Sequence, residues 1–486
     1  MSNHKKQSKD GLGLPNGFKY LPKPSLRVTL TGVIFLAACT SHTYQSEPIS
    51  PQLAAEQRSG LQHQDPGFKA FLEEHHYALA GWPLKQFDLA ALTLAAIHFN
   101  PAVQIAQSRI DIARAGETIA GQRPNPTLNF PDEPRDTADF YGLVVDFIFE
   151  RKAKREARLA RAQAERAAAE FELAQQIWSI YSKLHGNLIE YYAAGQHSGM
   201  LNKQRAVIGE SLHMLKQRVD AGQISEFEVS SLRLEQQQTA LQLSNQQYMV
   251  NDARHRLIVD TGLQADKFEE IEFVFSDLKQ HLRADAMAFD ELQIELLHSR
   301  FDINQKLAEY QAYEESLKLE IEKQYPDVTL SPGLLFERGQ SLWVLAASGT
   351  WPLFHNNDGQ IERALAERKR KQYEFIQLQT SLINELARKK QNYLDRLAAY
   401  EQSQQLFAAL QTRGREIEKQ FELGYSDQLK VLRSRLEIEK ARQTMFQIEL
   451  NVMRAAVKLE RVTQSPMHAS IKNLNFMKFQ HPQDNN

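Results

Sequence analysis

The chain has 486 residues and a formal net charge of −2, because 58 lysines and arginines nearly balance 60 aspartates and glutamates. This balance does not provide the basic domain that nucleic-acid binding requires, so we expect no nucleic acid among the partners. The single cysteine, Cys39, excludes a disulfide within the chain.

The N-terminus has the pattern of an export signal. Several basic residues precede an apolar run over residues 28–38 that stops at Cys39. This run is too short to span a bilayer but suits the apolar part of a signal peptide. Leu36-Ala37-Ala38-Cys39 resembles the lipobox of bacterial lipoproteins. That resemblance implies a signal peptide over 1–38, a palmitate-type acyl anchor on Cys39 and, since Thr40 is not an aspartate, delivery to the outer membrane. The alternative is a cysteine buried in an apolar helix, which the basic leader disfavours.

Two helical stretches follow a segment (39–86) that we expect to be periplasmic. Residues 87–121 are alanine-rich with helical periodicity and end before Pro124 and Pro126. Residues 154–221 contain no proline, and their apolar side chains recur at steps of three, four and seven, the coiled-coil period. At ~1.5 Å per residue, this second stretch predicts a rod about 100 Å long.

A turn ends the rod and a second helix returns. Gly222 suits a left-handed helix C-cap and Ser225 suits the N-cap of the next helix. The return helix is expected to reach about Thr261 and to close at Gly262.

The chain then repeats this plan at a constant offset of 202 residues. In the first region that recurs, Gln122, Pro124, Thr127 and Leu128 reappear as Gln324, Pro326, Thr329 and Leu330. In the second, Gly222, Val229, Arg233, Leu234 and Glu235 reappear as Gly424, Val431, Arg435, Leu436 and Glu437. One offset that serves two distant regions indicates a tandem duplication. The second copy is expected to have a helix over 286–323, a long apolar stripe over 382–421, a turn at Gly424 and a return helix to about Arg461.

Strand-like segments lie between the helices of each copy. Residues 127–149 and 328–353 are rich in β-branched and aromatic residues, with polar turns predicted at 132–136 and 337–340. Each strand has about the length that a tilted transmembrane strand needs. Four strands cannot close a barrel, and an open sheet in lipid leaves backbone groups unpaired at several kcal/mol each. Because the smallest such barrels have about eight strands, several chains must contribute, and three chains would give twelve.

These features together resemble the TolC family of outer-membrane efflux channels. The matching positions span residues 87–462 and include Asn100-Pro101, the segment 300–303, Pro124-Asn125-Pro126, the basic segment 150–155, Gly222 and Gly424. The resemblance implies a mostly α-helical homotrimer with a twelve-stranded transmembrane β-barrel above an α-helical periplasmic tunnel. It divides the chain into a first repeat (87–262), an equatorial segment (263–285), a second repeat (286–462) and a tail (463–486).

The resemblance also implies partners and a functional site. Such channels dock to a periplasmic adaptor protein and an inner-membrane pump of the resistance–nodulation–division type, and the expected docking tip contains Gly222, Ser225, Gly424 and Ser426. The family's best-known member narrows this tip with acidic side chains, whereas the matching positions here are Lys430 and Arg433. Glu226 and Glu228 follow the first turn. Either the constriction is lined differently or these four charges form ion pairs between hairpins.

Other functions have weaker support. The sequence has no HExxH, glycine-rich phosphate loop or GxSxG pattern, so no enzyme and no cofactor are predicted. His75-His76 alone does not provide enough ligands for a metal site. Pro124-Asn125-Pro126 and the segment 150–155 most resemble the outer-membrane component of cobalt–zinc–cadmium exporters, which implies heavy-metal cations as cargo. The alternatives are the same channel serving drug or other small-molecule efflux, and a lipid-anchored periplasmic coiled-coil or adaptor protein.

Overall fold

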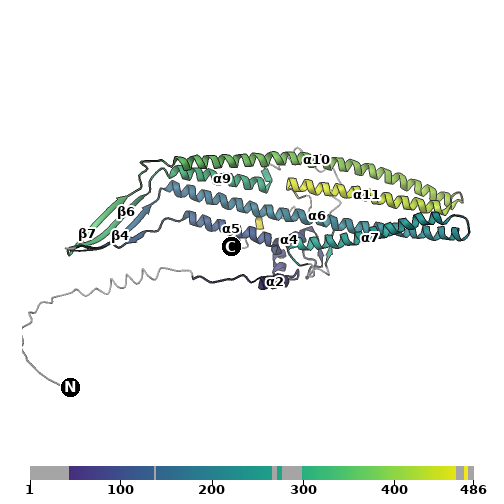
Figure 1. Ribbon diagram of the computed structural model, residues 1–486, viewed down its shortest axis with the longest axis horizontal. Coiled ribbons are helices and arrows are strands. Elements are labelled where there is room, and N and C mark those ends of the chain that lie inside the picture. The colour runs from purple at the N-terminus through teal and green to yellow at the C-terminus, as the bar shows by residue number, and fades with distance from the viewer. Residues whose placement is uncertain (1–42, 136–137, 265–270, 276–297, 467–475, 480–486) are drawn as a thin grey trace, which may run out of the picture. The chain divides into compact units, whose positions relative to one another are not determined.

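The computed structural model describes residues 43–135, 138–264, 271–275, 298–466 and 476–479 (Figure 1). Cys39 with its leader, most of the equatorial segment, residues 286–297 and most of the tail lie outside these ranges. By internal contacts the chain divides into two units, Met1–Gln57 and Arg58–Asn486. In the first unit the described residues are extended up to the start of α2 (Pro51–Gly60), a helix without buried residues.

Six helices form a layer that contains both copies of the repeat. They are α5 (Pro101–Gly121), α6 (Lys152–Asp220) and α7 (Glu226–Thr261) from the first copy, and α9 (Phe301–Glu322), α10 (Asp358–Glu422) and α11 (Gln428–Thr463) from the second. Helix α6 packs against α5 and α7 on one side and against α9 and α11 on the other, and α10 packs beyond α9 and α11. Figure 1 shows this order, with α5 and α7 along one edge and α10 along the other.

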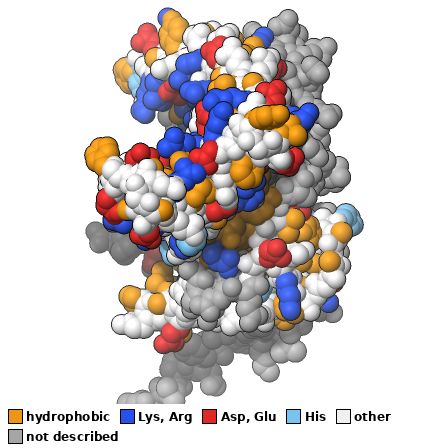
Figure 2. Space-filling model, turned by 90° about the vertical axis from the view of Figure 1, so that its right-hand side faces the viewer, with side chains coloured by type: hydrophobic (Ala, Val, Ile, Leu, Met, Phe, Trp, Pro, Cys, Tyr) orange, Lys and Arg blue, Asp and Glu red, His pale blue; other side chains and the backbone are white. Residues whose placement is uncertain are grey.

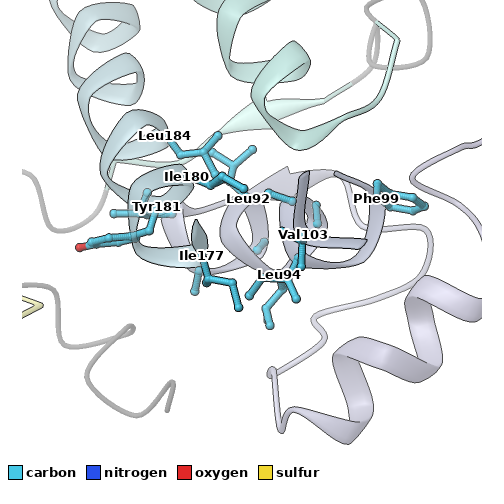
Figure 3. Close-up of a cluster of buried hydrophobic side chains, with 14 of the residues drawn as sticks. Leu92, Leu94, Phe99, Val103, Ile177, Ile180, Tyr181 and Leu184 are labelled. Atoms are coloured by element: carbon cyan, nitrogen blue, oxygen red, sulfur yellow. The ribbon is translucent and has the colours of Figure 1, made fainter. Parts of the chain in front are cut away.

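A large apolar core fixes the middle of the layer. It is built on α6 by Ile177, Ile180, Tyr181 and Leu184, which are buried against α4 (Leu89–Phe99) (Figure 3). The smaller elements α3 (Pro66–Glu74), β1 (Gln86–Phe87), β5 (Glu272–Phe273) and η4 (Phe476–Phe479) contribute side chains to the same cluster. Strands β1 and β5 pair in parallel. This core therefore joins residues from both ends of the chain.

The predicted helix over 87–121 is divided at Asn100. Pro101 cannot donate the backbone hydrogen bond that would continue α4, and the Asn100 side chain accepts one from Ala102 N as the cap of α5. Gly262, in the left-handed conformation (φ 85°), closes α7 beside this break. A side chain on Gly262 would place its Cβ 2.7 Å from Asn100 Cα, so the two helix ends meet where only glycine fits.

Within the described ranges no single helix has both the length and the apolar composition to cross a bilayer. Only α4 and α5 taken together meet those criteria, and they bend by 56° at their junction.

The sheet has four passes of the chain, as predicted. Its strands are β2 (Thr127–Asn129), β3 (Asp132–Arg135), β4 (Ala138–Phe149), β6 (Val328–Glu337) and β7 (Gln340–Ser348), in the order β2–β4–β6–β7 with β3 also paired to β4. β2 and β3 pair with β4 in one continuous antiparallel register and form a single pass. Pro131 divides that pass because it has no N–H, although its carbonyl still accepts from Gly142 N.

Two predicted features of the sheet are wrong in their limits. The polar segment 132–136 was expected to be a turn, but Asp132–Arg135 is strand β3, since the register with β4 continues through it. The last strand was expected to extend to residue 353 but ends at Ser348, before Pro352. The turn at 337–340 is confirmed as a two-residue hairpin, in which Arg338 (φ 52°) and Gly339 (φ 77°) both have positive φ.

The pairing register gives the sheet one apolar face. Residues directly opposite on paired strands point to the same side. One side consists of Leu128, Tyr141, Leu143, Val145, Phe147, Phe149, Val328, Leu330, Pro332, Leu334, Phe336, Ser341, Trp343, Leu345 and Ala347. The opposite side is mixed: Thr127, Asn129, Asp146, Thr329, Ser331, Glu337, Gln340 and Ser348 lie there among the apolar Phe140, Val144, Ile148, Leu335, Leu342 and Val344. An apolar outer face with a more polar inner face is the pattern of a transmembrane barrel wall.

Candidate functional site: the paired helical tips

The two helical hairpins reverse direction through the same backbone motif. In the first, Gln223 N donates to Arg218 O and Gly222 N to Val219 O; in the second, Tyr425 N donates to Gln420 O and Gly424 N to Phe421 O. These paired bonds define a Schellman C-cap, whose C′ residue is left-handed. Gly222 (φ 67°) and Gly424 (φ 78°) occupy that position, so the conformation predicted for both glycines is confirmed.

The helices that follow the turns are capped differently. Ser225 is the N-cap residue of α7, but its side chain makes no capping hydrogen bond. At the equivalent place in the second hairpin the cap is Asp427, whose carboxylate accepts from Leu429 N at 3.2 Å. Ser426 precedes the cap and is half-buried. The offset of 202 residues, applied to Ser225, would have found Asp427.

An ion pair joins the two hairpins. Arg218, in the last turn of α6, donates to Asp427 with an N–O distance of 2.6 Å. The hydrogen bond from Arg218 holds the pKa of Asp427 below its ordinary value, and the same bond raises the pKa of Arg218. Lys440 of α11 also reaches Glu235 of α7 at 2.6 Å. The two tips are thus connected through charges that sequence analysis did not identify.

The four charges that the sequence singled out lie on the outside of the tips. Glu226, Glu228, Lys430 and Arg433 are all exposed. Glu226 pairs with Arg233 of its own helix at 3.4 Å. Among the described residues of this one chain, Lys430 and Arg433 lie within 4 Å of no carboxylate. They therefore remain available to groups outside the protomer.

Beneath the turns, a small apolar cluster connects three helices. It contains Ile208, Leu212 and Leu215 of α6, Val229 of α7 and Leu429 of α11. At the apex, by contrast, Phe227 and Tyr425 are more than four-fifths exposed. Figure 2 views the molecule from this end and shows acidic, basic and hydrophobic side chains interspersed on its surface. Such a mixed, partly aromatic surface is typical of a protein interface.

The tips offer no arrangement for chemistry on a substrate. In the ranges that the structure describes, no three His, Cys, Asp or Glu side chains are grouped so that they could hold a metal ion. What the tips provide is a pair of hairpins held together by few apolar contacts and by exposed ion pairs.

Comparisons with known proteins agree with this architecture. A family model described as outer membrane efflux protein matches residues 293–463, the second copy of the repeat. The chain is 25% identical over 301 residues to the cobalt-zinc-cadmium resistance protein CzcC of Cupriavidus metallidurans, covering 61% of this chain and 70% of that protein. The solved structure of CusC superposes with a TM-score of 0.64 at 15% identity, and that of the outer-membrane channel OprN with 0.63 at 18% identity. Each covers 87% of this chain and 99% of the other.

The sheet with one apolar face, the layer of long helices and the paired tips give the chain the fold of the solved channel proteins CusC and OprN. More particularly, residues 293–463 match the outer membrane efflux protein family, and the fold shared with the solved channels extends over both copies. The family that residues 293–463 match is one of efflux proteins, which agrees with the expectation of a transport protein rather than an enzyme.

The different caps lead to a test at the tips. Replacing Asp427 with alanine removes the acceptor of Leu429 N, which we expect to cost about 1 kcal/mol and to speed amide exchange in the first turn of α11 roughly fivefold. Ser225→Ala removes no capping bond and should leave the first turn of α7 unchanged. Hydrogen–deuterium exchange of the purified protein measures both. Equal effects of the two substitutions would contradict the assigned caps.

Proposed function

We propose that the chain is one of three identical subunits of an exit duct that carries heavy-metal cations out of the cell. The sheet supports this assembly. Its outer passes, β2 with β3 and β7, each have a neighbour on one side only. In lipid these edges must pair with further strands, and copies of the same chain can supply them. Three copies bring twelve passes, enough to close a barrel.

The observation that carries the proposal is a stripe of exposed apolar residues at heptad spacing. Phe227, Leu234, Leu241 and Tyr248 of α7 follow one another at steps of seven, and each is between 56% and 81% exposed. Ile105, Ile112 and Ile119 form the same pattern on α5, on the same edge of the layer. Regular exposure of large apolar side chains is unfavourable in water and indicates a coiled-coil partner.

The opposite edge of the layer has a complementary surface. Helix α10 exposes Leu365, Tyr373, Ile376 and Leu406 along its length. If α10 of one copy lies against α5 and α7 of the next, both stripes are covered and the helices close a ring. With 69 residues at ~1.5 Å each, α6 gives that ring a length of about 100 Å. The rod predicted from the sequence thus becomes the wall of a tunnel through the periplasm.

The tips are the proposed inner end of the tunnel and its docking surface. Gly222, Ser225, Gly424 and Ser426 form the turns that a periplasmic adaptor protein would contact, and an inner-membrane pump would bind to that adaptor. Lys430 and Arg433 would pair with carboxylates of the neighbouring copy, among them Glu226 and Glu228. The similarity to CzcC supports metal cations as cargo. Cys39 would carry an acyl anchor in the outer membrane.

We expect the tip to be closed while the ion pair between the hairpins is formed and open when that ion pair is broken. Arg218 and Asp427 keep the two hairpins of one copy together. Because the pKa of Asp427 is held below its ordinary value, the attraction is fully present above that value of about 4. It is lost as the pH falls through the lowered pKa. Separation of the hairpins would widen the passage.

A first prediction concerns assembly. Leu241→Lys puts a charge into the middle of the α7 stripe in every copy, and we expect it to shift detergent-solubilised protein from three chains to one. Gln247→Lys adds the same charge at an exposed position of α7 away from the stripe and should leave the trimer intact. Mass photometry distinguishes the two. A trimer unaffected by Leu241→Lys would place the contact between copies elsewhere.

A second prediction concerns opening of the tip. In a planar bilayer the conductance of the unmodified channel should be constant from neutral pH down to about pH 4 and rise below it, as Asp427 becomes protonated. Asp427→Asn should have the higher conductance at neutral pH, and the unmodified channel should approach it as the pH falls below about 4. Glu418→Gln removes an ion pair with Arg435 inside one hairpin and serves as the control, with no change expected. Identical pH profiles for Asp427→Asn and the unmodified channel would overturn the role of this pair.

A third prediction concerns the cargo. A strain that lacks this chain should tolerate severalfold less cobalt, zinc or cadmium salt than its parent, and the intact gene should restore growth. Tolerance to a panel of drugs and detergents should not change. Sensitivity to drugs alone, with normal metal tolerance, would assign the duct to the other class of cargo.

A further inference from the structure

The two copies differ where the sheet passes into the long helix. In the first copy β4 ends at Phe149 and α6 begins at Lys152, so the connection is short. In the second copy β7 ends at Ser348 and α10 begins only at Asp358, which leaves the irregular link 349–357. Pro352 lies inside this link, where its missing N–H can continue neither a strand ladder nor a helix.

The end of this link is fixed to the neighbouring helix. The side-chain amide of Asn357 donates to Glu320 O at 2.9 Å and to Glu320 Oε2 at 3.0 Å. Gln324 donates to Asn356 O at 3.0 Å. Asn357 itself takes the left-handed conformation, with φ 63°. The link is therefore attached to α9 through side-chain hydrogen bonds.

This fixed link presents consecutive apolar side chains to its surroundings. Trp351 is 72% exposed, Leu353 is 77% exposed and Phe354 is 98% exposed. Large apolar side chains that are exposed together in this way favour an apolar partner. They follow directly on the apolar face of β7, which ends with Trp343, Leu345 and Ala347.

A groove of about 690 Å³ with cationic lining lies beside these side chains. Lys154 and Lys323 line it together with Tyr325 and His355, and Asp327 is the single carboxylate among the lining residues. Lys154 is bound to that carboxylate at 2.8 Å, while Lys323, about half exposed, pairs with Glu320 outside the lining. The groove thus joins an apolar wall to two ammonium groups.

We propose that this groove binds a phospholipid of the periplasmic leaflet of the outer membrane. Lys154 and Lys323 would take its phosphate, and an acyl chain would lie along Trp351, Leu353 and Phe354. Two features favour a lipid. Lys323 is about half exposed and can exchange its contact with Glu320 for one with a phosphate. The groove also follows the apolar face of β7 and places tryptophan beside lysine, both of which are favoured at the boundary between hydrocarbon and headgroups. The proposal rests on the outer-membrane channel described above.

Headgroup binding can be measured with purified protein. Phosphatidylglycerol is titrated into the detergent-solubilised trimer and bound lipid is counted by native mass spectrometry. Lys323→Gln should weaken binding about tenfold, the effect of one charge-assisted hydrogen bond. Lys152→Gln is the matched control, since Lys152 is a nearby exposed cation that does not line the groove. Equal affinities of the two variants would overturn the phosphate site.

The surroundings of the link 349–357 can be measured by a nitroxide label on Phe354→Cys, with the protein in vesicles of phosphatidylcholine and phosphatidylglycerol. The unsubstituted chain gives the background from Cys39, its sole native cysteine. We expect the label at 354 to be accessible to oxygen and protected from a water-soluble nickel chelate, whereas a label on Tyr425→Cys at the tip should favour the chelate. A label at 354 that behaves like the tip label, or is protected from both reagents by a neighbouring copy, would overturn the lipid site.

A third label distinguishes failure of the lipid site from failure of the membrane placement of the sheet, on which the lipid site depends. Trp343→Cys carries it on the apolar face of β7. If the label at 343 reports lipid while the label at 354 reports water, the lipid site alone is wrong. If both report water, the membrane placement of the sheet is wrong as well.

Discussion

The backbone polar groups at the two edges of the sheet are the constraint on which the rest of the molecule depends. Within the described residues each edge strand is paired on one side only, and lipid offers no partner for the N–H and C=O groups on its other side. The apolar face formed by Leu143, Leu334, Trp343 and their neighbours favours lipid all the same. In the proposed channel, both conditions are met when the sheet closes with copies of itself. Assembly is thus a requirement of the membrane-spanning part, and the helices must be arranged to permit it.

The duplication makes the helical layer compatible with that closure. In each copy two strands connect two helices, so the order of passes in the sheet, β2, β4, β6 and β7, is repeated by α5, α6, α9 and α10 in the layer. α7 and α11 then continue the positions of α5 and α9 toward the tips. A closed ring of strands consequently continues as a ring of helices without any crossing of the chain. The apolar stripes on α7 and α10 lie on the edges that this ring brings together.

Local patterns predicted the long elements well, because coiled-coil periodicity and glycine turns depend only on residues that are close in the sequence. The helix α6 and the left-handed conformations of Gly222 and Gly424 were found in this way. The strand β3 was missed because Asp132–Arg135 has the composition of a turn, and only its register with β4 makes it a strand. Register depends on a partner strand, and composition does not contain it.

At the candidate site, too, local features could be predicted from the sequence but long-range contacts could not. Gly222 and Gly424 follow from helix-capping rules that act within a few residues. The contact between Arg218 and Asp427 joins residues 209 positions apart and exists only because the two hairpins pack side by side. Sequence analysis instead selected charges next to the turns, such as Lys430, whose partners within one chain the structure does not provide. Charges on a surface can be located from sequence, but their partners cannot.

The distribution of buried groups along the helical layer indicates which part of the wall can move. At the middle, Glu460 of α11 is fully buried, accepts a hydrogen bond from the Tyr181 hydroxyl at 2.6 Å and lies 2.8 Å from His185 Nδ1. Burial and the nearby carboxylate raise the pKa of Tyr181, so the hydroxyl keeps its proton and remains a donor. Breaking such a buried contact leaves a charge without solvent or partner, which is strongly unfavourable. The pair at the tip is partly exposed, and water can replace either partner at little cost. If the hairpins separate as proposed, we expect the separation to begin at the tips, while the middle of the wall keeps α6 and α11 in place.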